Sequence, residues 1–296
     1  MAHGVRATTR RRAGGWWPYA VPAALVVVTL YVLPLAINGG LAFTDWNSFH
    51  SGIAFNGLDN LVTLQDQASL VNQVRLTLVY AVTASALGNA FALVLALALE
   101  RPTRSNHLFR AVFFIPVLLS PLAAGYVWSG LLDPSGPVNQ VISLAVPGFV
   151  EPWLGNSDLA IFLVAAVDAW KWSGFFTLIY IAGLTTVPVE LKEAAVAMGA
   201  GRWQVFRYVK LPFLAPAITF NVTVTVIGAM SAFDIVMATT RGGPGSATRV
   251  LNVLTLDQFG NGLYGLASAT SLVVTALVIV TAIPLVTVLR RREIEG

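Results

Sequence analysis

The chain has 296 residues, of which 56% are hydrophobic and 11% are charged, with a formal net charge of +4 at pH 7. Soluble domains carry about 25% charged residues, so this composition indicates a membrane protein without room for a soluble catalytic domain. There is no cysteine, and the three histidines lie far apart. Thiol chemistry and disulfides are therefore excluded, and neither a metal nor a cofactor is expected. The cations are distributed among several loops, so no nucleic-acid partner is expected.

Six apolar stretches are long enough to cross a membrane, which takes about 20 residues in a helix. Several contain proline, including Pro116 and Pro121, which is tolerated where neighbouring helices or water satisfy the freed backbone groups. The sequence therefore predicts an all-α polytopic membrane protein with six transmembrane helices packed around a path. The membrane domain is predicted at 19–289, between tails at 1–18 and 290–296. The predicted spans are Tyr19–Phe43, Val74–Leu99, Phe109–Leu132, Leu159–Leu184, Phe213–Ala238 and Leu263–Leu289.

Lys and Arg gather at alternate ends of the predicted spans, and this bias sets the orientation. Cations precede the first span, and they recur between spans two and three, between spans four and five, and after span six. The sequence thus predicts a multi-pass protein of the cell membrane with both termini in the cytoplasm. The opposite loops carry mainly acids: Asp45, Asp59, Asp66, Asp133, Glu151, Asp158 and Asp257. One face of the second span has only small residues, which permits close helix contact: Ala81, Ser85, Gly88 and Ala92.

The cytoplasmic loop between spans four and five contains the amphipathic stretch EAAVAMGAGRWQVFRYVKLP, residues 193–212. Pro188 suits the first turn of a helix, and Gly199 and Gly201 would bend the chain before a second short helix that Pro212 ends. Such a loop could lie on the anionic inner leaflet or dock into a groove of a cytoplasmic partner. Its small alanines favour docking. The expected apolar stripe consists of Leu191, Ala194, Ala195 and Met198.

This loop resembles the signature loop of binding-protein-dependent ABC importer permeases. The resemblance implies the type I ABC importer permease fold, and it makes the loop at about 188–212 a coupling helix that fits a cleft on an ATPase subunit. Met198 departs from sugar permeases, which often have an acid before the glycine. Trp203 belongs to the same loop and is expected to contribute to coupling. The matching positions are Glu193, Ala194, Ala195, Gly199, Val209, Leu211 and Pro212.

Four other stretches resemble the carbohydrate, maltose-type branch of that family: Phe55–Leu64, Phe109–Asn139, Trp170–Ala195 and Phe233–Thr248. The resemblance implies a permease subunit for a sugar or oligosaccharide. It also implies three kinds of partner: a cytoplasmic ABC ATPase dimer, a second permease, and an extracytoplasmic solute-binding protein that meets the segment from Arg241 to Thr248. None of the three lysines follows glycine as a P-loop requires, so the chain is not expected to hydrolyse ATP itself.

Polar and aromatic residues inside the spans are candidates for the substrate path. Asp168 and Lys171 lie in span four and Asp234 near the outer end of span five. A charge at bilayer depth costs about 2.5–3.5 kcal/mol on insertion scales, so each should face protein or water. Asp168 and Lys171 could equally form a structural pair along the helix.

The neutral candidates have two interpretations as well. Four aromatic residues could stack on a sugar ring, or they could pack against helices and lipid: Trp170, Trp172, Phe175 and Phe176. Asn221 could bond a hydroxyl group of the solute or join two helices. No catalytic residue is expected. The alternatives are an ABC importer for a polyol or glycerol-phosphate-like solute and an ion-coupled secondary transporter that uses Asp168.

Overall fold

The computed structural model describes residues 17–66, 69–291 and 293, and every regular element within them is a helix. The predicted N-terminal tail, residues 1–18, lies outside the described residues except for its last two positions. Arg292 and residues 294–296 of the predicted C-terminal tail lie outside them too. The described chain confirms the expected all-α class.

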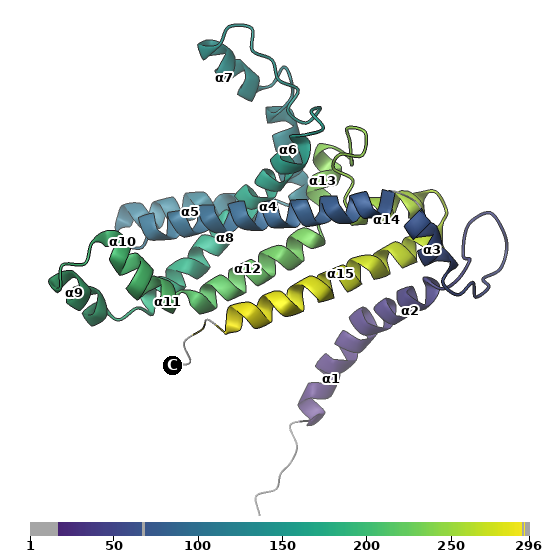
Figure 1. The fold of residues 1–296 in the computed structure, drawn as a ribbon, viewed down its shortest axis with the longest axis horizontal. Coiled ribbons are helices and arrows are strands. Elements are labelled where there is room, and N and C mark those ends of the chain that lie inside the picture. Colours follow the sequence, from purple (N-terminus) through teal and green to yellow (C-terminus); the bar gives the residue numbers. More distant parts are fainter. Residues whose placement is uncertain (1–16, 67–68, 292, 294–296) are drawn as a thin grey trace, which may run out of the picture.

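The first span is a continuous helical arm made of α1 (Trp17–Val27), the π-helix η1 (Val28–Val32) and α2 (Leu33–Leu41). Proline at position 34 cannot donate to the carbonyl group four residues earlier, and its ring would clash with that group. The chain widens there, so that the N–H of Leu33 bonds the carbonyl oxygen of Val28. The arm extends away from the other helices in Figure 1 and exposes its apolar side chains on all sides.

Four longer helices form the bundle: α4 (Ser69–Ala98), α8 (Ala160–Thr185), α12 (Ala215–Met230) and α15 (Tyr264–Arg290). Their apolar core includes Tyr80 of α4, Val164 of α8 and Met230 of α12. The small face predicted on α4 is confirmed, because all four of its residues are buried. A Cβ atom at Gly88 would lie 3.6 Å from the Cα atom of Ala169, so α4 and α8 approach closely there.

The predicted span at Phe109–Leu132 corresponds to a bent pair of helices and not to one continuous helix. The chain forms α5 (Arg104–Leu118) and α6 (Pro121–Leu131), which are bent by 99° relative to each other. Proline at 121 forces the preceding residue into an extended conformation, with Ser120 at φ −64° and ψ 148°. The hydroxyl of Ser120 then accepts a hydrogen bond of 3.1 Å from the N–H of Ala123, which caps the start of α6.

The predicted span at Phe213–Ala238 begins within two residues of α12 (Ala215–Met230) but extends beyond the end of that helix. At its start, the helical segment 202–213 meets α12 at an angle of 71°, and at its end α12 stops at Met230. A separate short helix, α13 (Asp234–Thr239), follows, with an acid in its first turn that suits the positive end of a helix. Helix α13 packs against α6, where a Cβ atom on Gly125 would lie 2.5 Å from that of Ala238. Packing between these two short helices, rather than helix continuity, determines this region.

Short helices lie at both ends of the bundle (Figure 1). Helices α3 (Asp59–Asp66) and α14 (Leu251–Gly260) lie beside the start of α15, and α7 (Pro137–Ala145) follows α6 away from the bundle. At the other end are α9 (Val189–Ala197), α10 (Arg202–Gln204), the π-helix η2 (Val205–Lys210) and α11 (Leu211–Phe213).

By length and composition, four helical segments of the described chain could cross a membrane, or up to six if each bent pair forms one span. The four unbroken spans, Tyr19–Leu41, Leu70–Ala98, Ala160–Thr185 and Tyr264–Arg290, agree with the predicted ones to within a few residues. The two bent pairs correspond to the third and fifth predicted spans.

Candidate functional site

The loop between α8 and α12, residues 188–212, folds as two short helices around a glycine turn, as the sequence predicted. Pro188 is the residue just before α9, one position earlier than expected, and its ψ of 136° directs the chain into the helix. The second half runs from Arg202 to Phe213 and bends into α12 at Leu214. The second helix continues one residue beyond Pro212 and ends at Phe213.

Gly199 makes the turn between the two helices possible. Its φ is +85°, in the left-handed region that side chains with a Cβ atom rarely adopt. The N–H of Gly199 bonds the carbonyl oxygen of Val196 at 2.9 Å, and the N–H of Ala200 bonds that of Ala195 at 3.0 Å. This pair of bonds is a Schellman motif, which satisfies the last carbonyl groups of α9. The glycine is thus required by the backbone of the turn.

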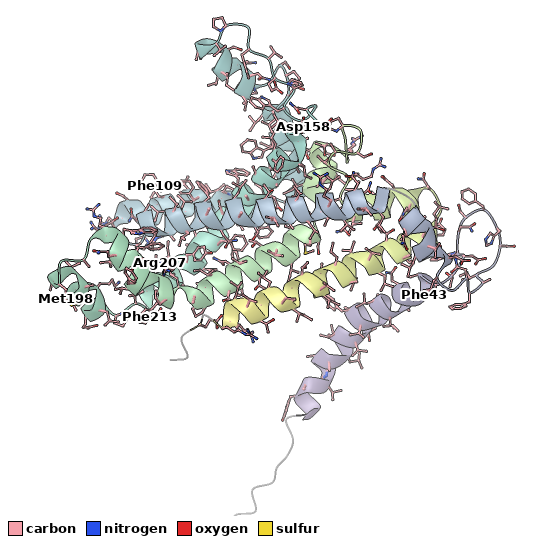
Figure 2. All side chains as sticks on the ribbon, viewed as in Figure 1. Phe43, Phe109, Asp158, Met198, Arg207 and Phe213 are labelled. Atoms are coloured by element: carbon pink, nitrogen blue, oxygen red, sulfur yellow. The ribbon has the colours of Figure 1, made fainter. Side chains whose placement is uncertain are left out.

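The tip of the 188–212 loop presents apolar side chains to its surroundings. Met198 is 82% exposed and Trp203 is 70% exposed, while Glu193 and Ala194 are exposed beside them. Figure 2 places Met198 at the end of the molecule opposite Phe43. Of the expected apolar stripe, Leu191, Ala194 and Met198 are exposed and Ala195 is buried. The surface that remains is a small apolar patch next to the exposed Glu193.

Glu100, just after α4, forms an ionic contact with the 188–212 loop. Its Oε1 lies 3.7 Å from Nζ of Lys192 in α9, and its Oε2 forms an ion pair and hydrogen bond with Nζ of Lys210 in η2. Sequence analysis missed this residue. Its only signal was that it is a lone acid at the edge of a cationic loop, and its partners are 92 and 110 positions away.

A cavity of about 260 Å³ lies between α4, α8, α12 and α13. Three of the six residues predicted for the path line it: Asp168, Trp172 and Asp234. Phe175, Phe176 and Phe233 add further aromatic rings. Among the described residues that line the cavity, none is Lys or Arg. The cavity is therefore aromatic on its walls and carries two carboxylates without a counter-charge.

Asp168 and Lys171 do not form the structural pair that their spacing allowed. The carboxylate of Asp168 accepts a hydrogen bond from the hydroxyl of Tyr80 at 3.1 Å, across the α4–α8 contact. The Nζ atom of Lys171 lies instead 3.9 Å from the centre of the Trp172 ring, a cation–π contact. The side chain of Lys171 is nearly inaccessible and does not line the cavity. Among the described residues, Asp168 therefore has no ion-pair partner.

Two further predicted path residues, Trp170 and Asn221, contact neighbouring helices and do not line the cavity. Trp170 packs edge-on against Trp128 of α6, with ring centres 5.4 Å apart, and does not line the cavity. Asn221 is fully buried, and its Nδ2 donates to the carbonyl oxygen of Phe176 at 3.1 Å. Of the two roles considered for Asn221, the structure supports the joining of α8 and α12.

A polar network that the sequence did not indicate lies between α4, α8 and α12. The hydroxyl of Tyr180 donates to Oδ1 of Asn89 at 2.7 Å, and Nδ2 of Asn89 donates to Oγ1 of Thr225 at 3.0 Å. Thr225 also shares a hydrogen bond of 2.8 Å with Ser85. Since Thr225 lines the cavity, the network positions a hydroxyl group at its wall.

The segment from Arg241 to Thr248 forms a tight turn after α13. Arg241 and Gly242 both have positive φ, at 52° and 85°, and the Gly243–Pro244 peptide is cis. The hydroxyl of Thr248 donates to the carbonyl oxygen of Gly243 at 2.8 Å and closes the turn. The following residue, Arg249, forms an ion pair of 3.2 Å with Asp257 in α14. A hydrogen bond within the turn and an ion pair just after it thus fix the shape of the turn.

A known protein family matches most of the chain. Residues 88–293 match the family described as the inner membrane component of binding-protein-dependent transport systems. The chain belongs to this family. The matched region includes the whole 188–212 loop and most of the cavity lining.

Curated relatives of this transport family are similar over almost their whole length. The chain is 28% identical over 282 residues to a probable starch degradation products transport system permease protein, AmyD, of Thermoanaerobacterium thermosulfurigenes, covering 95% of each chain. It is 29% identical over 268 residues to the trehalose/maltose transport system permease protein MalF of Thermococcus litoralis, covering 88% of this chain and 89% of the relative.

A solved structure supports the same permease fold. A chain of a bacterial ABC transporter involved in the import of the acidic polysaccharide alginate superposes with a TM-score of 0.80. The match covers 93% of this chain and 96% of that chain, at 20% sequence identity. The described helices thus have the arrangement of an ABC importer permease.

Proposed function

We propose that this chain is the permease subunit of an ATP-driven importer for a neutral sugar or oligosaccharide. An extracytoplasmic solute-binding protein would deliver the solute, and the bent pairs would complete six spans within residues 19–289. The alternating positions of Lys and Arg along the sequence support cytoplasmic termini. The names of the permease relatives, which refer to starch degradation products and to trehalose and maltose, support the solute class.

The 188–212 loop is proposed to couple transport to ATP hydrolysis by a cytoplasmic ATPase dimer. Its exposed apolar tip and the exposed Glu193 support docking into a groove on such a partner. A rigid Schellman turn at Gly199 gives the docking surface a fixed shape. The residues proposed for coupling are Glu193, Ala194, Ala195, Gly199, Trp203, Leu211 and Pro212.

A second permease subunit and the solute-binding protein complete the proposed assembly. The helical arm from α1 to α2 exposes apolar side chains on all sides, which is suited to lipid and to a neighbouring permease. The turn from Arg241 to Thr248 is proposed to receive the solute-binding protein, since its hydrogen bonds fix its shape at the end of α13.

The lining of the interior cavity supports a neutral solute. Aromatic rings such as Trp172 and Phe233 offer flat faces for a sugar ring, and carboxylates such as Asp168 accept hydrogen bonds from hydroxyl groups. A phosphate ester would meet two carboxylates and, among the described residues that line the cavity, no Lys or Arg, which disfavours it. The volume of about 260 Å³ is just below the ~300 Å³ at which ligand pockets usually begin, so it suits a single ring.

Two experiments test this function. Purification of the tagged chain from its native membrane in a mild detergent should recover an ATPase, a second permease and no soluble enzyme of other kinds. Recovery of the chain alone, while a control complex survives, would refute the importer. In proteoliposomes with the native binding protein, maltotriose should be taken up in an ATP-dependent manner and sn-glycerol 3-phosphate should not. Selective uptake of the phosphate ester would refute the neutral-sugar class.

A further inference from the structure

Glu100 contacts both halves of the 188–212 loop at once. Lys192 belongs to α9, before the glycine turn, and Lys210 belongs to η2, after it, yet the two oxygens of one carboxylate reach both ammonium groups. The side chains are partly buried: 22% of Glu100, 26% of Lys192 and 19% of Lys210 is exposed. Water screens such a group less than it screens a fully exposed pair. The contact therefore links the two halves of the loop to each other through Glu100.

The backbone on which Glu100 stands is itself fixed. Arg110 of α5 donates from Nη2 to the carbonyl oxygens of Leu99 and Glu100, and from Nε to that of Leu99 at 3.2 Å. These carbonyl groups follow the last turn of α4, where a helix leaves its acceptors unsatisfied. A guanidinium group satisfies them here, so the end of α4 cannot easily unwind. Glu100 is thus attached to a rigid helix end.

Helix α4 leads directly from Glu100 to the cavity. Tyr80, Ala84 and Gly88 of this helix line the cavity. Gly88 is ten residues from Ala98, the end of the helix, which corresponds to about 15 Å along the axis. A displacement of the 188–212 loop that carries Glu100 with it must therefore shift or tilt the cavity wall, because the helix between them has no break.

We propose that Glu100 is a positioning residue that transmits movement of the 188–212 loop to α4, and through α4 to the cavity. This inference rests on the proposed coupling role of the loop. Elsewhere in the described chain the ion pairs are Asp45–His50 and Arg249–Asp257, both remote from this loop. Apolar packing of Phe206 against the core that includes Leu99 and Leu214 is independent of the charge, so the loop should remain folded without Glu100.

Spin labels can measure the attachment directly, because the native chain has no cysteine. Labels on Ala197→Cys in α9 and Ala90→Cys in α4, both at exposed positions, report the distance between the loop and the helix. Native Glu100 should give a single narrow distance distribution, and Glu100→Gln a broader one. The charge reversal Glu100→Lys with Lys192→Glu and Lys210→Glu should restore the narrow distribution. An unchanged distribution in Glu100→Gln overturns the inference.

Coupling in the complete complex gives the second readout. In proteoliposomes, Glu100→Gln should lower maltotriose uptake per ATP hydrolysed by about tenfold, the scale of a typical coupling energy. The charge reversal should recover most of this ratio, and Asp158→Asn, which removes an exposed carboxylate remote from the loop, should leave it native. A native ratio of uptake to ATP hydrolysis in Glu100→Gln overturns this inference and leaves the proposed function intact. If the native complex contains no ATPase, the proposed function fails, and the inference fails with it.

Discussion

The hydroxyl group of Tyr80 in α4 donates a hydrogen bond of 3.1 Å to Oδ2 of Asp168 in α8. The two residues are 88 positions apart in the sequence, and both line the interior cavity. The bond holds the carboxylate at the cavity wall. Asp168 is therefore the side chain at which a change of charge should affect the solute most.

Asp168→Asn should raise the KM for solute uptake by about tenfold. The amide keeps the shape of the side chain but replaces a charged acceptor, and a hydrogen bond to a charged group contributes about 1.5–3 kcal/mol. Initial uptake rates in proteoliposomes, measured over a range of concentrations of loaded binding protein, provide the test. Asp158→Asn, on an exposed loop, should behave as the native protein does. An unchanged KM in Asp168→Asn would mean that the cavity does not contact the solute.

Gly199→Pro should abolish uptake while leaving expression and membrane insertion intact. Proline removes the N–H that bonds Val196 and cannot adopt the φ of +85°, so the Schellman turn is lost. Gly199→Ala should lower uptake less, because a left-handed conformation costs a non-glycine residue about 1–2 kcal/mol. Gly201→Ala is the matched control, since Gly201 has a φ of −71° and an added Cβ atom would meet only the Gln204 side chain. Native uptake by Gly199→Pro would contradict a coupling role for the turn.

Trp203→Ala should weaken binding of the ATPase by about 30-fold or more. The side chain is 70% exposed and stacks against Phe206, with ring centres 5.4 Å apart, so its removal deletes a preformed apolar anchor. Anchors of this kind cost about 2 kcal/mol or more when they are truncated. Titration of the purified ATPase onto immobilised permease in detergent measures the effect. Tyr126→Ala, at an exposed position of α6, is the control. Equal affinities for both variants would show that the ATPase binds elsewhere.

Gly174→Ala should destabilise the protein strongly. A Cβ atom at this position of α8 would overlap the carbonyl group of Phe113 in α5, and backbone atoms cannot move aside cheaply. Overpacking of this kind costs about 1–3 kcal/mol or more. The control is Gly130→Ala in α6, where an added Cβ atom meets nothing within 4 Å. Melting temperatures from size-exclusion chromatography in detergent should fall for Gly174→Ala and stay level or rise for Gly130→Ala. The reverse order would refute the close α5–α8 contact.

Hydropathy located the four unbroken spans because burial in lipid demands a long uniform stretch, and such a stretch is visible in the sequence alone. It could not locate the bend at Ser120. Proline at 121 is compatible with either a kinked span or a new helix, and capping by the Ser120 hydroxyl decides between them. The end of α12 at Met230 was hidden for a similar reason, because α13 is as apolar as the helix before it.

The candidate site was only partly predictable for a different reason. The residues of the 188–212 loop are contiguous, so their spacing carried the information. Glu100 and the cavity are assembled from segments that are far apart in the sequence. Whether Lys171 pairs with Asp168 or rests on the Trp172 ring depends on how α8 faces its neighbours, which no local pattern records.

The helical arm at the N-terminus has a consequence for how the protein is made. The C-terminal end of this arm is anchored by an apolar cluster in which Ala42 packs with Leu266 and Ala269 of the last helix. These two residues are synthesised more than 220 residues after Ala42. At about 5–20 residues per second, a ribosome needs roughly 10–45 s to produce that stretch. During this interval the first span must wait in the bilayer without its partner. A chain that stalls before α15 would therefore leave an apolar, unanchored helix exposed to membrane proteases.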